Sequence, residues 1–400
     1  MAKKITMTAV LAEEIWMARI LLAWELGDGF GHVSRMLTIA EALRDRGHDC
    51  VFVVRNLEVV AARVQASGFD VLPAPTQAIR YAPSNGHPPT SVGDILAFIG
   101  FAEIERLRPF IKIWTSLVSR LAPDVAILDY APTARLAIGD ACPTIVIGDG
   151  FTLPPAIDGQ FPKFRSGDRL VDEAAILDVI DRVQSPVAGW KPHILPDLFQ
   201  GTQNFVITLP QMDYYGDQRQ TPAIGPITPL PKPADGTPST DFFAYLSTGY
   251  KHIQRACQTI ASPQLSGSLF LRDSRPDGRE TLRERGLTVH EVPQDMVAMA
   301  EKARVFIHHG GIGTCETVMA LGRPQVIFPR HAEQRINAAT LKRAGVAMTV
   351  PEGPDVEVAE MVRQVRAFID DPRPHQKARE IATALAQQDH SSVATVADAC

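Results

Sequence analysis

The chain has 400 residues, of which 45% are apolar, so it can bury a large core, and its length favours two domains over one. Its formal net charge of −5 at pH 7 gives no electrostatic reason to expect nucleic acid as a partner. The five cysteines form no CxxC pair, which predicts reduced thiols in a cytoplasmic protein without a zinc site.

The first 16 residues carry two lysines and a short apolar run that contains Thr6 and Thr8. That run is short for a signal peptide, so we expect residues 1–16 to be an extension before the first domain. No apolar run approaches the ~20 residues of a membrane helix, so the sequence predicts no membrane span.

Residues 17–225 alternate buried strands with amphipathic helices. The run "ARILLAWEL" is continuously apolar, as a buried parallel strand requires, and a helix from about Ser34 to Arg46 follows it. The runs "CVFVV", "VAILD" and "TIVIG" continue the pattern. This is the βαβ signature of a doubly wound sheet, so residues 17–225 are predicted to form one Rossmann-like domain.

The pattern repeats after a proline-rich break. Residues 221–240 hold six prolines, and we expect a linker at 226–240, a second Rossmann-like domain at 241–385 and a tail or helix at 386–400. Five strand-like runs follow the break: "DFFAYLSTGY", "GSLFLRD", "LTVHEVP", "ARVFIHHGG" and "RPQVIFP". Helices are expected from about His252, Gln294, Thr314, Gln334 and Val356.

The first strand ends in "ELGDGFGHVSRM", with Gly29 and Gly31 before His32 at the start of a helix. Ligands of such sheets lie at the carboxyl ends of strands, so His32 could face a cleft; it could also be a surface cap beside packing glycines. A nicotinamide site is the other alternative, but the spacing is G-x-G-x-G and the next strand ends in Arg55-Asn56, without an acid for ribose.

Asp129 ends another apolar run, where it could orient His32 as a general base or only cap a helix. In "HHGGIGT", glycines precede a helix whose N-terminus favours anions. Glu333 and Gln334 form an acid–amide pair suited to sugar hydroxyls.

Together these motifs resemble the GT-B glycosyltransferases that use nucleotide-activated sugars, with the "GxGHxxR" start of a bacterial subgroup. The resemblance covers most of residues 17–350, in the order "GxGH", "VPQDM", "HHGGIGT", "GRPQVIFP" and "EQRINAATLKRAGVA". It implies two Rossmann-like domains that face each other across a cleft. It also implies that His32 is the catalytic base and Asp129 its partner. The residues that it implies for the nucleotide sugar are Gly29, Gly31, Thr248, Gly249, Val292, Gln294, His309, Gly311, Gly313, Thr314, Glu333 and Gln334.

Three positions depart from the plant-type pattern of this family. Glu291 stands where a tryptophan stacks on uracil, and Thr317 stands where an acid binds ribose, which leaves the base and the ribose contact open. Glu316 is one residue early and, about 100° around the helix, should point elsewhere. For Arg35, a surface ion pair is favoured slightly over a phosphate contact.

The resemblance implies an inverting transfer from a UDP or dTDP sugar to a hydroxyl of a small-molecule acceptor. No DxD-type pair lies near the loops, so we expect no required metal, and no cofactor beyond the donor itself. A homodimer is one assembly that the sequence permits. The alternatives are a sugar-nucleotide epimerase or hydrolase, a binding protein without transfer, and an oxidoreductase.

Overall fold

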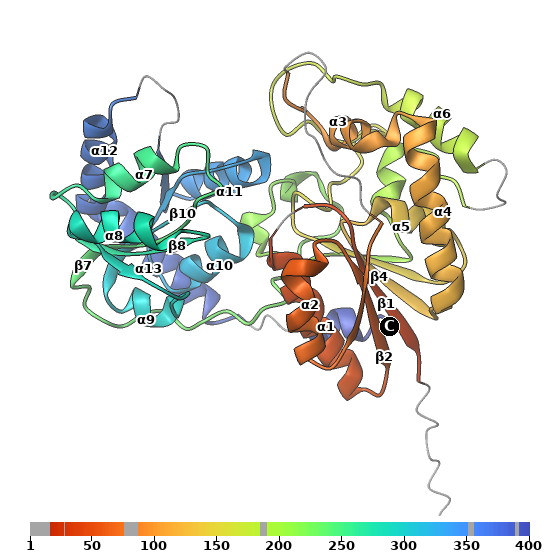
Figure 1. Cartoon of the computed structure of the whole chain (residues 1–400), viewed down its shortest axis with the longest axis horizontal. Helices are drawn as coiled ribbons and strands as arrows, with labels where there is room; N and C mark the ends of the chain where they lie inside the picture. Colours follow the sequence, from red (N-terminus) through yellow and green to blue (C-terminus); the bar gives the residue numbers. More distant parts are fainter. Residues whose placement is uncertain (1–16, 28, 76–86, 185–189, 351–355, 389–391) are drawn as a thin grey trace, which may run out of the picture.

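The structure is a computed structural model that describes all residues except 1–16, 28, 76–86, 185–189, 351–355 and 389–391. The predicted extension at 1–16 therefore lies outside the described residues. Two six-stranded parallel sheets, each covered by helices, form two α/β domains, as predicted (Figure 1). None of the described helices is long and apolar enough to cross a membrane.

The N-terminal sheet has the order β3-β2-β1-β4-β5-β6. Its strands are β1 (Arg19–Trp24), β2 (Asp49–Val54), β3 (Asp70–Pro73), β4 (Val125–Asp129), β5 (Thr144–Gly148) and β6 (Gln203–Val206). Its helices are α1 (Gly31–Asp45), α2 (Leu57–Ala66), α3 (Val92–Leu96), α4 (Ile104–Leu121), α5 (Pro132–Ile138) and α6 (Glu173–Gln184). A π-helical turn (Ala97–Phe101) and 3-10 turns (Leu195–Phe199, Pro210–Met212, Gly216–Gln218) complete the domain and its exit.

The C-terminal sheet has the order β12-β11-β10-β7-β8-β9. Its strands are β7 (Thr240–Ser247), β8 (Gly267–Arg272), β9 (Thr288–His290), β10 (Ala303–His308), β11 (Gln325–Ile327) and β12 (Ala347–Thr349). The helices of this half are α7 (Ile253–Ile260), α8 (Pro276–Glu284), α9 (Met296–Ala300), α10 (Ile312–Ala320), α11 (Ala332–Arg343), α12 (Val358–Asp370), α13 (Pro372–Leu385) and α14 (Ser392–Ala397).

Strand β1 is apolar on both faces because helices cover both faces of its sheet. Leu21 packs in the same cluster as Trp114 of α4, on one side. Leu22 packs with Met36 of α1, on the other side. Each such buried side chain contributes roughly 1.5–3 kcal/mol, so the continuous apolar run is what holds the strand in the centre of the sheet.

The chain ends on the domain with which it began. Val396 and Ala397 of α14 join the core formed by α1 and the N-terminal sheet, and Arg46 pairs with Asp398 at 2.6 Å. Figure 1 shows the C-terminus beside α1 and β1 of the N-terminal domain, while α13 lies with the C-terminal domain. The C-terminal segment therefore bridges both domains.

Several elements were not predicted. Strands β3, β6 and β12 are short and at sheet edges, so they lack a continuous apolar run. Helix α1 also begins at Gly31, three residues before the predicted Ser34, which places His32 inside its first turn.

Candidate active site

The carboxyl ends of strands from both sheets border one cleft of about 290 Å³. The predicted site residues on its wall are Gly29, Gly31, His32, His309, Gly311, Gly313, Thr314, Glu333 and Gln334. Arg35, Asp149, Ser247, Arg272 and Arg330 also border it, and sequence reasoning had not placed them there. Residues far apart in the chain thus share one cavity.

His32 is held by aromatic stacking on Trp24 and by a hydrogen bond with Asp129. The imidazole stacks on Trp24, with ring centroids 5.0 Å apart, and its Nδ1 lies 3.0 Å from Oδ1 of the fully buried Asp129. Gly27 has φ +87°, and a Cβ there would lie 2.6 Å from the His32 Nε2. This glycine is therefore required both by the turn and by the close approach of the ring.

Arg35 corrects the expectation of a surface ion pair. It lies one turn after His32 on α1, is only 9% exposed, and donates from Nε to Asp129 Oδ2 at 2.6 Å and from Nη2 to Oδ1 at 2.5 Å. Its Nη1 lies 3.6 Å from Asp149 Oδ2. Burial works to raise the pKa of Asp129, but the positive charge of Arg35 and the hydrogen bonds from His32 and Arg35 outweigh burial and lower it.

The Nδ1 atom of His32 therefore has two neighbours with opposite demands. Asp129 requires a proton on Nδ1, whereas the Arg35 Nη2, 2.8 Å away, requires a bare Nδ1 as acceptor. A proton on Nδ1 leaves Nε2 bare and able to accept a proton from a hydroxyl. The carboxylate of Asp129 favours this tautomer.

Asp149 is a site residue that sequence reasoning missed. It follows β5, is buried, and its Oδ1 accepts the N–H groups of Phe151 and Thr152 at 2.9 Å each. The signal was present in "TIVIGDG", where an acid ends an apolar strand as Asp129 does. The parallel sheet brings both acids to the same edge.

Helix α10 begins at the cleft. Gly310, with φ +88°, packs so closely that a Cβ would lie 2.9 Å from Ile327, whereas a Cβ at Gly311 or Gly313 would meet no described atom within 4 Å. Gly310 thus serves the packing, and the other two leave backbone exposed to the cavity. Backbone N–H groups at a helix N-terminus favour an anion.

His309 differs from its expected role as a phosphate donor. Its Nε2 accepts the Ser247 N–H at 2.9 Å, so its Nδ1 carries the proton and donates to the Phe328 carbonyl at 2.8 Å. Burial, with the charges of Arg330 and Arg272 nearby, lowers the pKa of His309 to about 4. The neutral ring has no N–H left for a phosphate and instead joins the loops that follow β7 and β11.

Glu333 also differs from its expectation. Burial and the negative charge of Asp149 raise its pKa to about 8, which favours the protonated acid near pH 7. One of its oxygens is then a donor, not half of a pair of acceptors. The Oε1 atom of Gln334 accepts a hydrogen bond from the backbone N–H of Arg330 at 2.9 Å.

A second cavity of about 210 Å³ shares Gly313 and Thr314 with the cleft. Its other described walls are Phe243, Tyr245, Phe270, Pro293, Gln294, Met296 and Thr317. Gln294 is thus at a cavity as predicted, whereas Val292 is exposed and borders neither.

Thr248 and Gly249 border neither cavity either: the Thr248 hydroxyl donates to the Asp273 carbonyl, and the Gly249 N–H donates to Ser247. Glu291 forms surface ion pairs with Arg279 and Arg283, and it borders neither cavity. It therefore does not replace the stacking tryptophan of the plant-type pattern.

Glu316 borders neither cavity, and its side chain contacts the segment after β6. Its Oε1 accepts the Thr208 hydroxyl at 2.6 Å and the Leu209 N–H at 2.7 Å. Burial raises its pKa to about 7. Glu316 therefore joins α10 to the segment after β6.

Comparison with known proteins shows what the chain is similar to. Residues 279–398 match the model of the erythromycin biosynthesis protein CIII-like, C-terminal domain. This segment is therefore similar to that domain, and the match covers less than half of the chain. UDP-glycosyltransferase 13 from Pueraria montana var. lobata is 26% identical over 151 residues, which cover 36% of this chain and 33% of that protein. The chain thus spans about a third of the length of this curated relative.

Solved structures match nearly the whole chain. The calicheamicin glycosyltransferase CalG4 matches with a TM-score of 0.69 at 17% identity, covering 96% of this chain and 97% of that one. The glycosyltransferase VinC, in complex with dTDP, matches with a TM-score of 0.62 at 18% identity, covering 96% and 100%. The chain therefore has the GT-B fold, as the motifs predicted.

Proposed function

We propose that this protein is an inverting glycosyltransferase that moves a sugar from a UDP or dTDP sugar to a hydroxyl of a small-molecule acceptor. One observation carries the proposal: His32, paired with the buried Asp129 of the same domain, borders the same cleft as the glycine-rich start of α10 in the other domain. A base thus faces an anion site. The names of the matched proteins, a UDP-glycosyltransferase and an enzyme in complex with dTDP, support the choice of donor.

In this mechanism, His32 removes the proton of the acceptor hydroxyl as the oxygen attacks the anomeric carbon. Asp129 stabilises the imidazolium that forms, and Arg35 keeps Asp129 ionised. The diphosphate leaves as the new bond forms, so a single displacement inverts the anomeric centre. Glu333 and Gln334 hold the sugar. The transfer needs no metal in this proposal.

His32→Ala should lower transfer by roughly 10²- to 10⁴-fold, because a positioned general base contributes about that much. Nucleotide binding should not change. His193→Ala, at an exposed histidine, is the matched control. The assay follows release of nucleoside diphosphate with and without an acceptor panel, and mass spectrometry identifies the product. Release that never depends on an acceptor would favour a hydrolase or epimerase, and near-normal transfer by His32→Ala would remove His32 as the base.

A further inference from the structure

Arg330 lies where the proposed donor needs a positive charge. We propose that the Arg330 guanidinium, with Arg272 beside it, binds the diphosphate of the nucleotide sugar and stabilises the charge that builds up as it leaves. This inference rests on the proposed function. It assigns to an arginine the contact that the sequence motif had assigned to His309.

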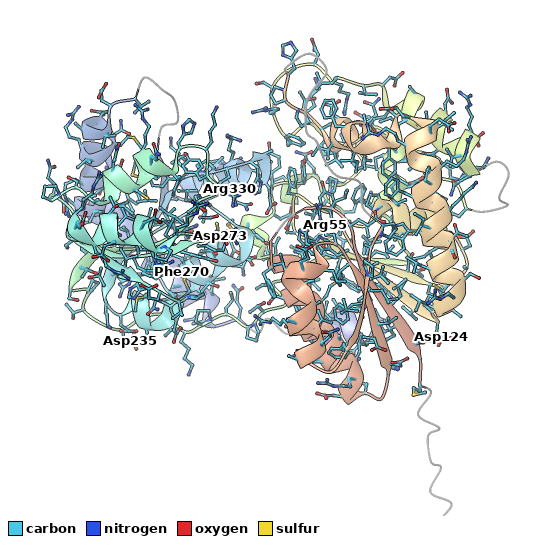
Figure 2. All side chains as sticks on the ribbon, viewed as in Figure 1. Arg55, Asp124, Asp235, Phe270, Asp273 and Arg330 are labelled. Atoms are coloured by element: carbon cyan, nitrogen blue, oxygen red, sulfur yellow. The ribbon has the colours of Figure 1, made fainter. Side chains whose placement is uncertain are left out.

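The two arginines come from strands on either side of the sheet centre. In the order β11-β10-β7-β8, Arg330 follows β11 and Arg272 ends β8, where it pairs in register with Ser247. The glycine-rich loop follows β10, between them. Both arginines border the same cleft as Gly311 and Thr314. Figure 2 labels Arg330, and also Asp273 beside Arg272 in the chain, on the C-terminal domain.

The other arginines of the cleft already have carboxylate partners. Arg35 is bound to Asp129, and the Arg272 Nε pairs with Asp273 Oδ2 at 3.2 Å. Within the part of the chain that the structure describes, no carboxylate pairs with the half-buried Arg330. The N–H donors of its planar guanidinium are therefore not bound to a carboxylate. Their geometry matches the oxygens of a phosphate group.

Close packing directs Arg330 to the cleft. A Cβ on Gly249 would lie 3.0 Å from its Nη2, so the guanidinium rests against the backbone of the loop after β7. Its own backbone N–H is held by Gln334. A side chain supported in this way loses less conformational freedom when it binds an anion. Gly249, implied by the resemblance as a phosphate contact, here makes room for the arginine.

The role left for His309 is structural. Its two ring nitrogens bind the backbone at Ser247 and Phe328, the two loops that carry the cleft ends of β7 and β11. Arg330 lies two residues after Phe328 in the chain. His309 thus positions the arginine's loop, and the arginine supplies the charge.

Calorimetry with UDP, dTDP, uridine and thymidine tests this assignment without any acceptor. Arg330→Gln should weaken UDP or dTDP binding by about 10- to 100-fold, the worth of a charge-assisted hydrogen bond, and leave the bare nucleosides unchanged. Arg272→Gln should have a smaller effect, because Asp273 already pairs with Arg272. Arg330→Lys should restore part of the loss. The matched control is Arg335→Gln, an exposed arginine of α11.

Each result decides the matter. Equal diphosphate affinity in the wild type and Arg330→Gln would overturn this inference and leave the proposed function standing. Equal weakening of nucleosides and diphosphates would assign Arg330 a structural role and overturn it as well. A wild-type protein that binds neither UDP nor dTDP would overturn both this inference and the proposed function.

Discussion

Removing the charge of Arg35 should destabilise the N-terminal domain strongly. Arg35 is 9% exposed and lies between Asp129 and Asp149, which are 0% and 4% exposed. Arg35→Met keeps a side chain of similar length but leaves two buried carboxylates without their cation. Breaking a buried pair in this way costs about 3–5 kcal/mol, so the melting temperature should fall by about 6–20 °C.

The loss should depend on pH in a definite direction. The pKa of Asp129 is lowered in the folded protein, so its ion pair stabilises the fold above the unfolded pKa of about 3.9, and this stability is lost as pH falls through the folded pKa. Without Arg35, burial raises the folded pKa above the unfolded one, and stability then falls as pH rises between the two values. The difference between wild type and variant should therefore be larger near pH 8 than near pH 5.

Thermal unfolding followed by circular dichroism at both pH values measures this effect. Arg106→Met is the control, because Arg106 pairs with Glu103 on the exposed face of α4 and should cost little. A variant that melts within about 2 °C of wild type near pH 8 would refute the reasoning, as would a loss that is no smaller near pH 5.

Three further outcomes are expected. The pKa of Glu333 is raised to about 8, so the donor KM of the wild type should rise as the pH passes 8. The Glu333→Gln variant should show no such rise. A rise in both proteins would show that Glu333 is not its cause. Glu316→Ala should lower the free energy of unfolding by about 1–3 kcal/mol, because Thr208 and Leu209 lose their buried acceptor, and Glu316→Gln should cost less; equal losses in urea titrations would contradict this. Transfer should continue at full rate after a chelator removes divalent cations, and loss that Mg²⁺ restores would show that a metal is required.

Much of the fold followed from local patterns. Continuous apolar runs predicted the central strands, because a strand buried on both faces needs apolar side chains on both. His32 and Asp129 were predicted to meet although they lie 97 residues apart, because neighbouring parallel strands bring their carboxyl ends to one edge. Edge strands such as β3 and β12 were not predicted, because their pattern is short and partly exposed.

The charges of the site depended on contacts that no local pattern contains. Arg35 is not among the apolar residues of α1, so the sequence suggested that it is exposed. In the structure it is buried, and it pairs with the carboxylates of Asp129 and Asp149 at the ends of β4 and β5. Burial, and then the negative charge of Asp149 from the other domain, raise the pKa of Glu333.

The sequence by itself thus determined the two-domain α/β architecture and the residues at the strand ends, since both follow from the period of apolar residues and from parallel pairing. Only the tertiary structure decided the raised pKa of Glu333, the hydrogen bonds of His309, the partners of Arg35 and the place of Arg330 at the cleft. The environment of each group depends on neighbours from several strands and from both domains, which exclude water from it and place charges near it. Those neighbours meet only when the chain has folded.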